Sequence, residues 1–155
     1  MDTVVASRSF EGNLDALVAY CRTLNSRMNW PGAVLEWEQR GTLYYTVGMR
    51  LKPATMTDVQ LEEKLFDVER RDNGVVRFET FQRCTWPHGH VDARADYLFV
   101  PGVNGAPNTM QLAYTYDTPT GGLIKTREVP AFHEAMQRVV DAYLAKLTSG
   151  VFVGI

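Results

Sequence analysis

The sequence predicts an α+β fold in which one antiparallel sheet of about seven strands wraps around one long C-terminal helix. The first observation is a strongly amphipathic stretch at residues 130–147, and the second is that nearly everything upstream of it reads as strand. A helix of about 18 residues is about 27 Å long and needs a large partner surface, which the sheet would supply. Its apolar residues recur at spacings of three and four: Phe132, Met136, Val139, Val140, Tyr143, Leu144 and Leu147.

The ends of this helix carry the expected signals. Pro130 suits the first turn, where its missing N–H costs nothing, and Lys146 places a cation at the negative end of the helix dipole. Gly150 follows as a stop.

The first residues predict one strand and two short helices. Thr3–Phe10 alternates as a strand, and Asn13 is an N-cap for a helix of about twelve residues with an apolar stripe. A second helical turn at Asn25–Met28 must stop before Trp30-Pro31-Gly32, because proline disfavours the α conformation in the preceding residue.

Six further strands follow without an intervening helix. Arg40-Gly41-Thr42 joins the first two, Asp72-Asn73-Gly74 is the strongest hairpin turn, and a bulge is expected near Glu62-Glu63-Lys64. The expected strands are Ala33–Gln39, Leu43–Leu51, Met56–Arg70, Val75–Thr85, His90–Val100 and Thr109–Asp117.

Length and composition exclude several classes of protein. The 155 residues fit a single domain spanning 1–155, and 16 Lys and Arg against 18 Asp and Glu give a net charge of -2, unlike a general nucleic-acid binder. No apolar run approaches the about 20 residues of a spanning helix, so we expect no stable membrane insertion. Two cysteines without metal-site or disulfide spacing, and a start without a secretion signal, predict a cytoplasmic protein.

This order of elements resembles the helix-grip fold of the START-related (SRPBCC) superfamily, which includes lipid-transfer and polyketide cyclase/dehydratase-like proteins. The resemblance covers nearly the whole chain and is one of pattern, without a shared catalytic motif. It implies a strongly bent sheet that grips the last helix, with a hydrophobic cavity between them. The cavity would be lined by Tyr45, Ala93, Ala95, Tyr97, Tyr114, Phe132, Met136 and Val140.

The two alanines on the 90–100 strand are the best sequence sign of a cavity, because small side chains opposite a helix leave volume. In the alternative interpretation, Phe132 and Met136 fill that volume and the core is solid. Four tyrosines of the strands, Tyr45, Tyr97, Tyr114 and Tyr116, would be the polar groups of the cavity or satisfied core residues.

Candidates for catalysis and metal binding are few. His133, in the first turn of the long helix, is the one candidate acid/base, since histidine titrates close to neutral pH. His88-x-His90-x-Asp92 has suitable metal ligands at alternate strand positions, but we expect His90 and Asp92 to face solvent. We expect no metal and no cofactor, and inert thiols at Cys21 and Cys84.

Three functions remain open at this point. The first is a binding protein for a small hydrophobic or amphipathic ligand such as a lipid, a polyketide or an aromatic metabolite. The second is a cyclase/dehydratase-like enzyme that uses the same cavity. The third is an interaction protein with a filled core, whose apolar Val151-Phe152-Val153 segment would contact a partner or form a homodimer.

Overall fold

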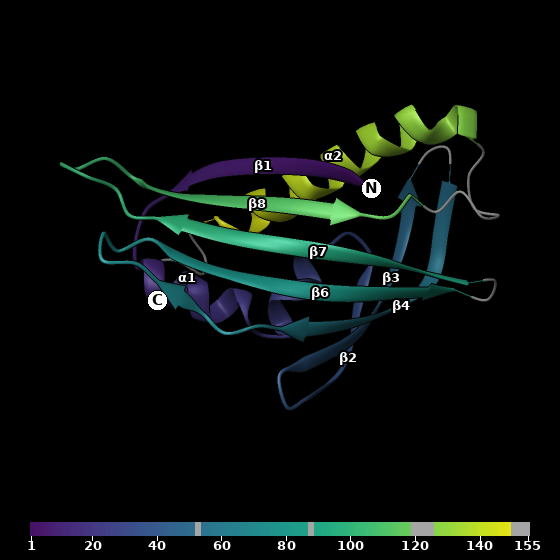
Figure 1. Ribbon diagram of the computed structural model, residues 1–155, viewed down its shortest axis with the longest axis horizontal. Coiled ribbons are helices and arrows are strands. Elements are labelled where there is room, and N and C mark those ends of the chain that lie inside the picture. Colours follow the sequence, from purple (N-terminus) through teal and green to yellow (C-terminus); the bar gives the residue numbers. More distant parts are fainter. Residues whose placement is uncertain (52–53, 87–88, 119–125, 150–155) are drawn as a thin grey trace.

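The computed structural model describes residues 1–51, 54–86, 89–118 and 126–149, without the side chains of residues 49–51, 54–58 and 86. Within these ranges, eight strands form one antiparallel sheet in the order β1-β8-β7-β6-β4-β3-β2, with β5 paired to β6 (Figure 1). The strands are β1 (Asp2–Phe10), β2 (Ala33–Gln39), β3 (Thr42–Leu51), β4 (Ala54–Leu65), β5 (Glu69–Arg70), β6 (Val76–Trp86), β7 (Gly89–Val100) and β8 (Asn108–Tyr116). The helices are α1 (Leu14–Cys21), the 3-10 turns η1 (Asn25–Asn29) and η2 (Thr126–Glu128), and α2 (Val129–Leu147).

The long helix α2 lies against the inner face of the sheet, where it packs mainly on β1 and also contacts β3, β8 and η1 (Figure 1). The predicted α+β helix-grip arrangement is therefore confirmed. The apolar stripe of α2 is buried as the spacing predicted, and Pro130 and Lys146 occupy its first and last turns. Gly150 and the Val151-Phe152-Val153 segment lie outside the described residues.

Alternation sets the two faces of the sheet. In β7 every second residue from Ala93 to Phe99 is buried against the helices, while the residues between them face outward. On the outer face Arg77 pairs with Asp96 at 2.9 Å and Arg83 with Asp92 at 3.0 Å. Such exposed pairs contribute little to stability, so the inner face accounts for most of the folding free energy.

The prediction for the middle of the sheet was wrong in one place. The expected long strand 56–70 is two strands, β4 and β5, and no bulge occurs at Glu62-Glu63-Lys64, which pair in unbroken register with β3 and β6. The register shifts instead between Leu35 and Trp37 in β2 and between Val47 and Met49 in β3. Glu63 is a regular strand residue whose side chain faces the interior. A charged residue at an inward position interrupts the apolar alternation, and this interruption led to the prediction of a bulge.

The first helix is also shorter than the predicted twelve residues. Asn13 caps it as expected, accepting a hydrogen bond of 3.1 Å from the Ala16 N–H. It ends at Cys21 because Thr23 donates to the Tyr20 carbonyl at 2.6 Å and its hydroxyl accepts from the Ser26 N–H. These side-chain bonds turn the chain directly into η1, which confirms the predicted second helical turn.

Candidate ligand-binding site

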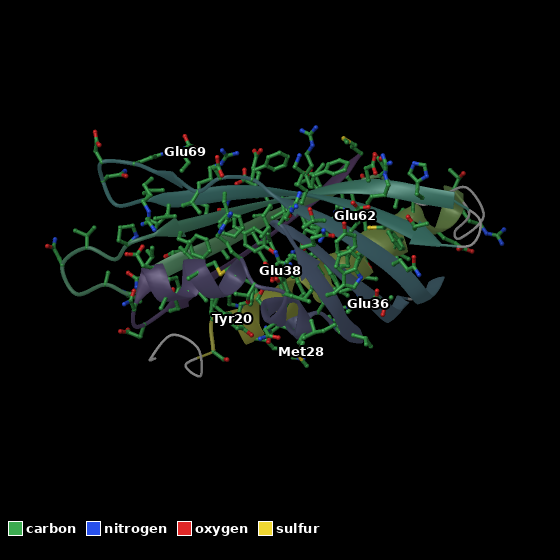
Figure 2. The ribbon with its side chains drawn as sticks, turned by 90° about the horizontal axis from the view of Figure 1, so that it is seen from below. Tyr20, Met28, Glu36, Glu38, Glu62 and Glu69 are labelled. Atoms are coloured by element: carbon green, nitrogen blue, oxygen red, sulfur yellow. The ribbon has the colours of Figure 1, made fainter. Side chains whose placement is uncertain are left out.

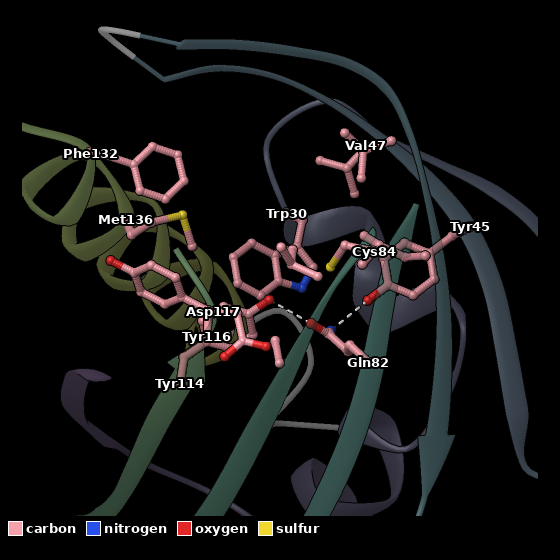
Figure 3. A pocket seen from close by; sticks show the side chains of 14 residues that line it. Trp30, Tyr45, Val47, Gln82, Cys84, Tyr114, Tyr116, Asp117, Phe132 and Met136 are labelled. Carbon is pink, nitrogen blue, oxygen red and sulfur yellow. Dashed lines mark hydrogen bonds between the residues drawn. The ribbon is translucent and has the colours of Figure 1, made fainter. Parts of the chain in front are cut away.

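A small pocket lies between the inner face of the sheet and the first turns of α2 (Figure 3). Its volume is about 50 Å³, which holds a few water molecules or part of a small ring. Most of the lining is apolar, and the polar groups come from the strands. The lining residues are Trp30, Tyr45, Val47, Val59, Leu61, Gln82, Cys84, Val91, Ala93, Tyr114, Tyr116, Asp117, Phe132 and Met136.

Five of the eight residues expected at a cavity line this pocket: Tyr45, Ala93, Tyr114, Phe132 and Met136. Ala95, Tyr97 and Val140 are equally buried, but they lie in the packed core and do not line it. Ala95 and Tyr97 follow Ala93 on the same face of β7, so alternation groups them although the pocket ends before them. A role in binding stays a prediction for all eight.

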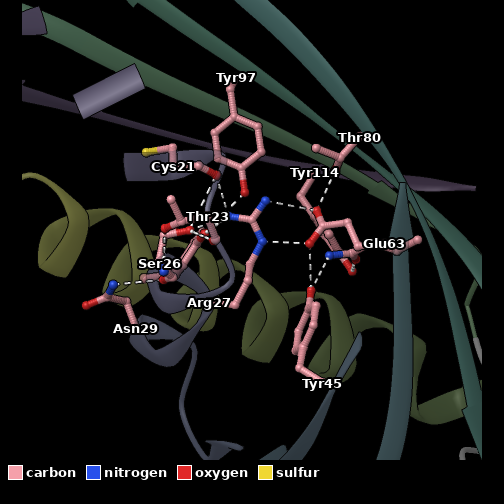
Figure 4. A network of polar contacts seen from close by, with 12 residues as sticks. Cys21, Thr23, Ser26, Arg27, Asn29, Tyr45, Glu63, Thr80, Tyr97 and Tyr114 are labelled. Carbon is pink, nitrogen blue, oxygen red and sulfur yellow. Dashed lines mark hydrogen bonds and ion pairs between the residues drawn. The ribbon is translucent and has the colours of Figure 1, made fainter. Parts of the chain in front are cut away.

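A buried ion pair lies in the interior beside the apolar core. Arg27 of η1 and Glu63 of β4 are completely buried, and two hydrogen bonds join them, from Nε to Oε1 at 2.6 Å and from Nη2 to Oε2 at 3.3 Å (Figure 4). Burial alone would lower the pKa of Arg27, but the neighbouring Glu63 carboxylate raises it well above its ordinary value. Arg27 therefore keeps its positive charge inside the protein.

The Nη1 group of Arg27 has partners on three sides. Its Nη1 donates to the Cys21 carbonyl at 2.8 Å, to Ser26 Oγ at 2.8 Å and to the Tyr143 hydroxyl at 2.9 Å. The Tyr143 hydroxyl is also 3.2 Å from that of Tyr97, over whose ring the Arg27 guanidinium lies at 5.4 Å. Arg27 thus holds η1, α1 and α2 together, and it does not line the pocket.

A chain of hydrogen bonds runs from Glu63 to the pocket. Tyr45 donates to Glu63 Oε1 at 2.9 Å, Gln82 Nε2 donates to the Tyr45 oxygen at 2.8 Å, and Tyr114 donates to Gln82 Oε1 at 2.6 Å (Figures 3 and 4). Thr80 completes the set, donating to Glu63 Oε2 at 2.6 Å. Burial, with a further contribution from the Glu63 charge, raises the pKa of Tyr45 and Tyr114 well above the usual range, so both phenols stay protonated.

Trp30 forms one wall of the pocket and was not among the residues that the sequence analysis singled out for binding. Its ring is stacked on Tyr143 with centroids 4.3 Å apart and an interplanar angle of 11°, and it is tilted against Tyr114 at 5.6 Å. The side chain is only 5 % exposed, and its Nε1 has no hydrogen-bond partner among the described residues. An unpaired buried donor of this kind is costly in a folded protein.

His133 lies beside the pocket but does not line it. Its Nδ1 is 3.1 Å from the hydroxyl of Tyr116, which does line it, and Asp117 follows in the chain. Burial raises the pKa of Tyr116 to about 12, with a further contribution from Asp2. Tyr116 therefore connects His133 to the pocket.

The described candidate metal ligands of the 88–92 segment do not line the pocket. His90 is exposed and Asp92 partly exposed, on the outer face as expected, while His88 lies outside the described residues. Within the described part of the chain, no group of three His, Cys, Asp or Glu side chains could hold a metal ion.

Burial raises the pKa of the thiols of Cys21 and Cys84 to about 12, in line with the expected inert thiols.

The polar network carried a sequence signal that was missed. Glu63 lies at every second position of β4 from Val59 and Leu61, which are buried, so the three side chains point to the same face of the sheet. In β6 the buried polar residues Thr80 and Gln82 interrupt an inward series that is otherwise apolar: Val76, Phe78 and Cys84. Three polar residues at inward positions of neighbouring strands predict a buried network, although they do not identify Arg27 as its cation.

The comparisons with known proteins identify a fold. No family model and no curated protein matches the sequence. Among solved structures, a conserved protein from Geobacillus kaustophilus has a TM-score of 0.69 at 10 % identity, over 95 % of this chain and 93 % of that one. A START superfamily protein from Mycobacterium smegmatis has a TM-score of 0.57 at 12 % identity, over 97 % and 96 %. A putative protein in the dynemicin biosynthetic locus has a TM-score of 0.51 at 13 % identity, covering this whole chain but 50 % of that one.

The chain therefore has a START-like helix-grip fold, as the order of its elements predicted, and at these identities the likeness concerns the fold alone. None of the described helices is long and apolar enough to cross a membrane.

Proposed function

We propose that this START-like chain binds a small, largely apolar ligand in the pocket between its sheet and α2. The observation that supports this most is the composition of the pocket. An apolar wall from Val47, Phe132 and Met136 faces a polar end at Tyr114 and Gln82. Ligand sites in proteins commonly combine an apolar lining with a few placed polar groups.

The small volume limits what can enter without movement. Even a ligand of one ring must displace side chains, and Met136 is the most adaptable of the lining residues because its unbranched side chain has three rotatable bonds. The network around Arg27 is far less adaptable, since any displacement there would break hydrogen bonds to a buried charge. Expansion would therefore occur on the α2 side of the pocket.

The first test is native mass spectrometry of the freshly purified protein, with a denatured sample extracted and analysed in parallel. The expected result is a non-covalent adduct of small mass or, for a weak ligand, a rise in melting temperature with members of a panel of lipids and aromatic metabolites. Ala93→Leu, which fills the pocket, should abolish the shift. Ala113→Leu, on the outer face of β8, should retain it. If the wild type binds none of these compounds, the filled-core interaction protein becomes the better interpretation.

A second candidate is a cyclase- or dehydratase-like reaction in the same pocket, favoured by the hydrogen bond between His133 and Tyr116. The pocket would hold a reactive chain close to its attacking geometry while this pair moves a proton. Tyr116→Phe and His133→Gln should then abolish turnover of a bound substrate while leaving its affinity nearly unchanged. A loss of affinity without any turnover in the wild type would favour the binding protein.

A further inference from the structure

Among the described residues that line the pocket, Trp30 carries a buried donor, Nε1–H, without a hydrogen-bond partner. Its ring is held in place by stacking on Tyr143 at 4.3 Å and by contact with Tyr114 at 5.6 Å, so the N–H cannot turn to another partner without breaking this packing. The side chain is 5 % exposed, and no described residue accepts its proton. A ligand group at this position must therefore accept a hydrogen bond.

The ion pair fixes the direction of every hydrogen bond in the neighbouring chain. Glu63 accepts from Arg27 with both of its carboxylate oxygens, so Tyr45 gives its single proton to Glu63. The Tyr45 oxygen can then only accept, which orients the Gln82 amide with its NH₂ towards Tyr45 and its oxygen towards Tyr114. Tyr114 must in turn give its single proton to Gln82.

The hydroxyl oxygen of Tyr114 can therefore accept a hydrogen bond from a ligand but cannot donate one. Its hydroxyl proton is committed to Gln82 Oε1 at 2.6 Å, and only lone pairs of its oxygen remain for another partner. Figure 3 shows this hydroxyl at the pocket end of the chain that passes through Gln82 and Tyr45. The pocket lining therefore holds an oxygen that can accept a further hydrogen bond, on Tyr114, and an indole N–H without an acceptor, on Trp30.

The charges around the pocket disfavour an anionic group. Asp117 is the charged residue among its described lining side chains, and Arg27 does not line the pocket. A carboxylate placed here would meet an acceptor oxygen at Tyr114 and a negative charge at Asp117, without a cation to compensate its desolvation.

We propose that the pocket selects a neutral apolar ligand bearing a hydroxyl group, which accepts a hydrogen bond from Trp30 Nε1 and donates one to the Tyr114 oxygen. This inference rests on the proposed binding function and specifies the ligand class. A hydroxyl is suited to the position because one oxygen both accepts and donates, whereas an ether or ketone can only accept.

Four one-ring probes of similar shape test the selection: 4-ethylphenol, 4-ethylanisole, ethylbenzene and 4-ethylbenzoate. Their affinities are measured by calorimetric titration at neutral pH, and the indole N–H signals of the protein are followed by nitrogen-15 NMR. Each net hydrogen bond changes affinity by about 3- to 10-fold, so 4-ethylphenol should bind at least about 10-fold tighter than ethylbenzene. The anisole should lie between them and the benzoate should bind weakest.

Variants assign the effect to the two residues. The Trp30 indole signal, identified by its loss in Trp30→Phe, should move downfield with the phenol and the anisole but not with ethylbenzene. Trp30→Phe keeps the stacked ring and removes its donor, so it should bring the anisole and ethylbenzene to similar affinities and leave the phenol only the preference, about 3- to 10-fold, that its bond to the Tyr114 oxygen supplies. Tyr114→Phe should reduce the preference for the phenol over the anisole and serves if Trp30→Phe does not fold. Trp37→Phe, on a half-exposed residue stacked on Tyr44 away from the pocket, is the matched control.

The outcomes separate this inference from the function on which it rests. Equal binding of all four probes, or tightest binding of the benzoate, would overturn the hydroxyl selection and leave the binding function standing. Absence of binding by every probe, together with a bare mass of the purified protein, would overturn both.

Discussion

Replacing Glu63 by glutamine removes one charge from the interior and leaves the Arg27 guanidinium buried without its counter-ion. Glu63 is the acceptor for Arg27, Tyr45 and Thr80. In the variant, the new NH₂ group must face donors that have no other acceptor nearby. Breaking a buried ion pair from one side costs about 3–5 kcal/mol.

The loss is measured by urea unfolding and by thermal melting. With a slope of about 2 kcal/mol per molar urea, the midpoint should fall by about 2 M. The melting temperature of a chain of this length should fall by about 6–20 °C, at about 2–4 °C per kcal/mol. Glu62→Gln, the neighbouring exposed residue of β4, is the matched control and should change stability by less than about 0.5 kcal/mol.

A double variant shows whether the loss comes from the pair itself. Arg27→Met with Glu63→Met replaces both charges by apolar groups and should recover part of the stability that either single change removes. The reasoning would be refuted if Glu63→Gln cost no more than Glu62→Gln, or if the two methionine substitutions were simply additive.

Three further predictions concern the core and its titrating groups. Ala93→Leu should weaken ligand binding at little cost in stability because it fills the pocket, whereas Ala95→Leu should cost about 1–3 kcal/mol in urea unfolding because that site is already packed. Cys21 and Cys84, with thiol pKa values of about 12, should resist a thiol reagent at pH 8 in the native protein and both react in denaturant. Burial raises the pKa of Tyr143 to about 12 from an unfolded value of about 10. Its contribution to stability is therefore complete below about pH 10 and is lost as the pH rises towards 12, so phenolate absorbance and unfolding should appear together.

The sequence predicts the architecture because its periodicities are local and strong. The apolar stripe of α2 and the alternation of β7 each follow from a few neighbouring residues. The same alternation could not locate the pocket, since Ala93 and Ala95 share a face and only one lines it. Whether each alanine lines the pocket depends on which side chains of other elements lie opposite it. The residues next to an alanine in the sequence do not reveal those distant neighbours.

The polar network was missed for a related reason. Arg27 and Glu63 are 36 residues apart, and Arg27 and Tyr143 are 116 residues apart. Charged residues are rarely fully buried, so the Glu62-Glu63-Lys64 segment suggested a solvated irregularity. The sign of burial was that Glu63 lies two residues after Leu61 in the strand, and therefore on the same inward face.

The division of the interior into a fixed half and an adaptable half has a consequence for the evolution of this chain. A substitution at Arg27, Glu63 or Tyr143 leaves other groups unpaired, so these positions can change only through rare, coordinated replacements. Val47 and Met136 contact the pocket and can be exchanged for other apolar residues one at a time. Selection can therefore alter the shape of the pocket in single steps while the fold is inherited unchanged.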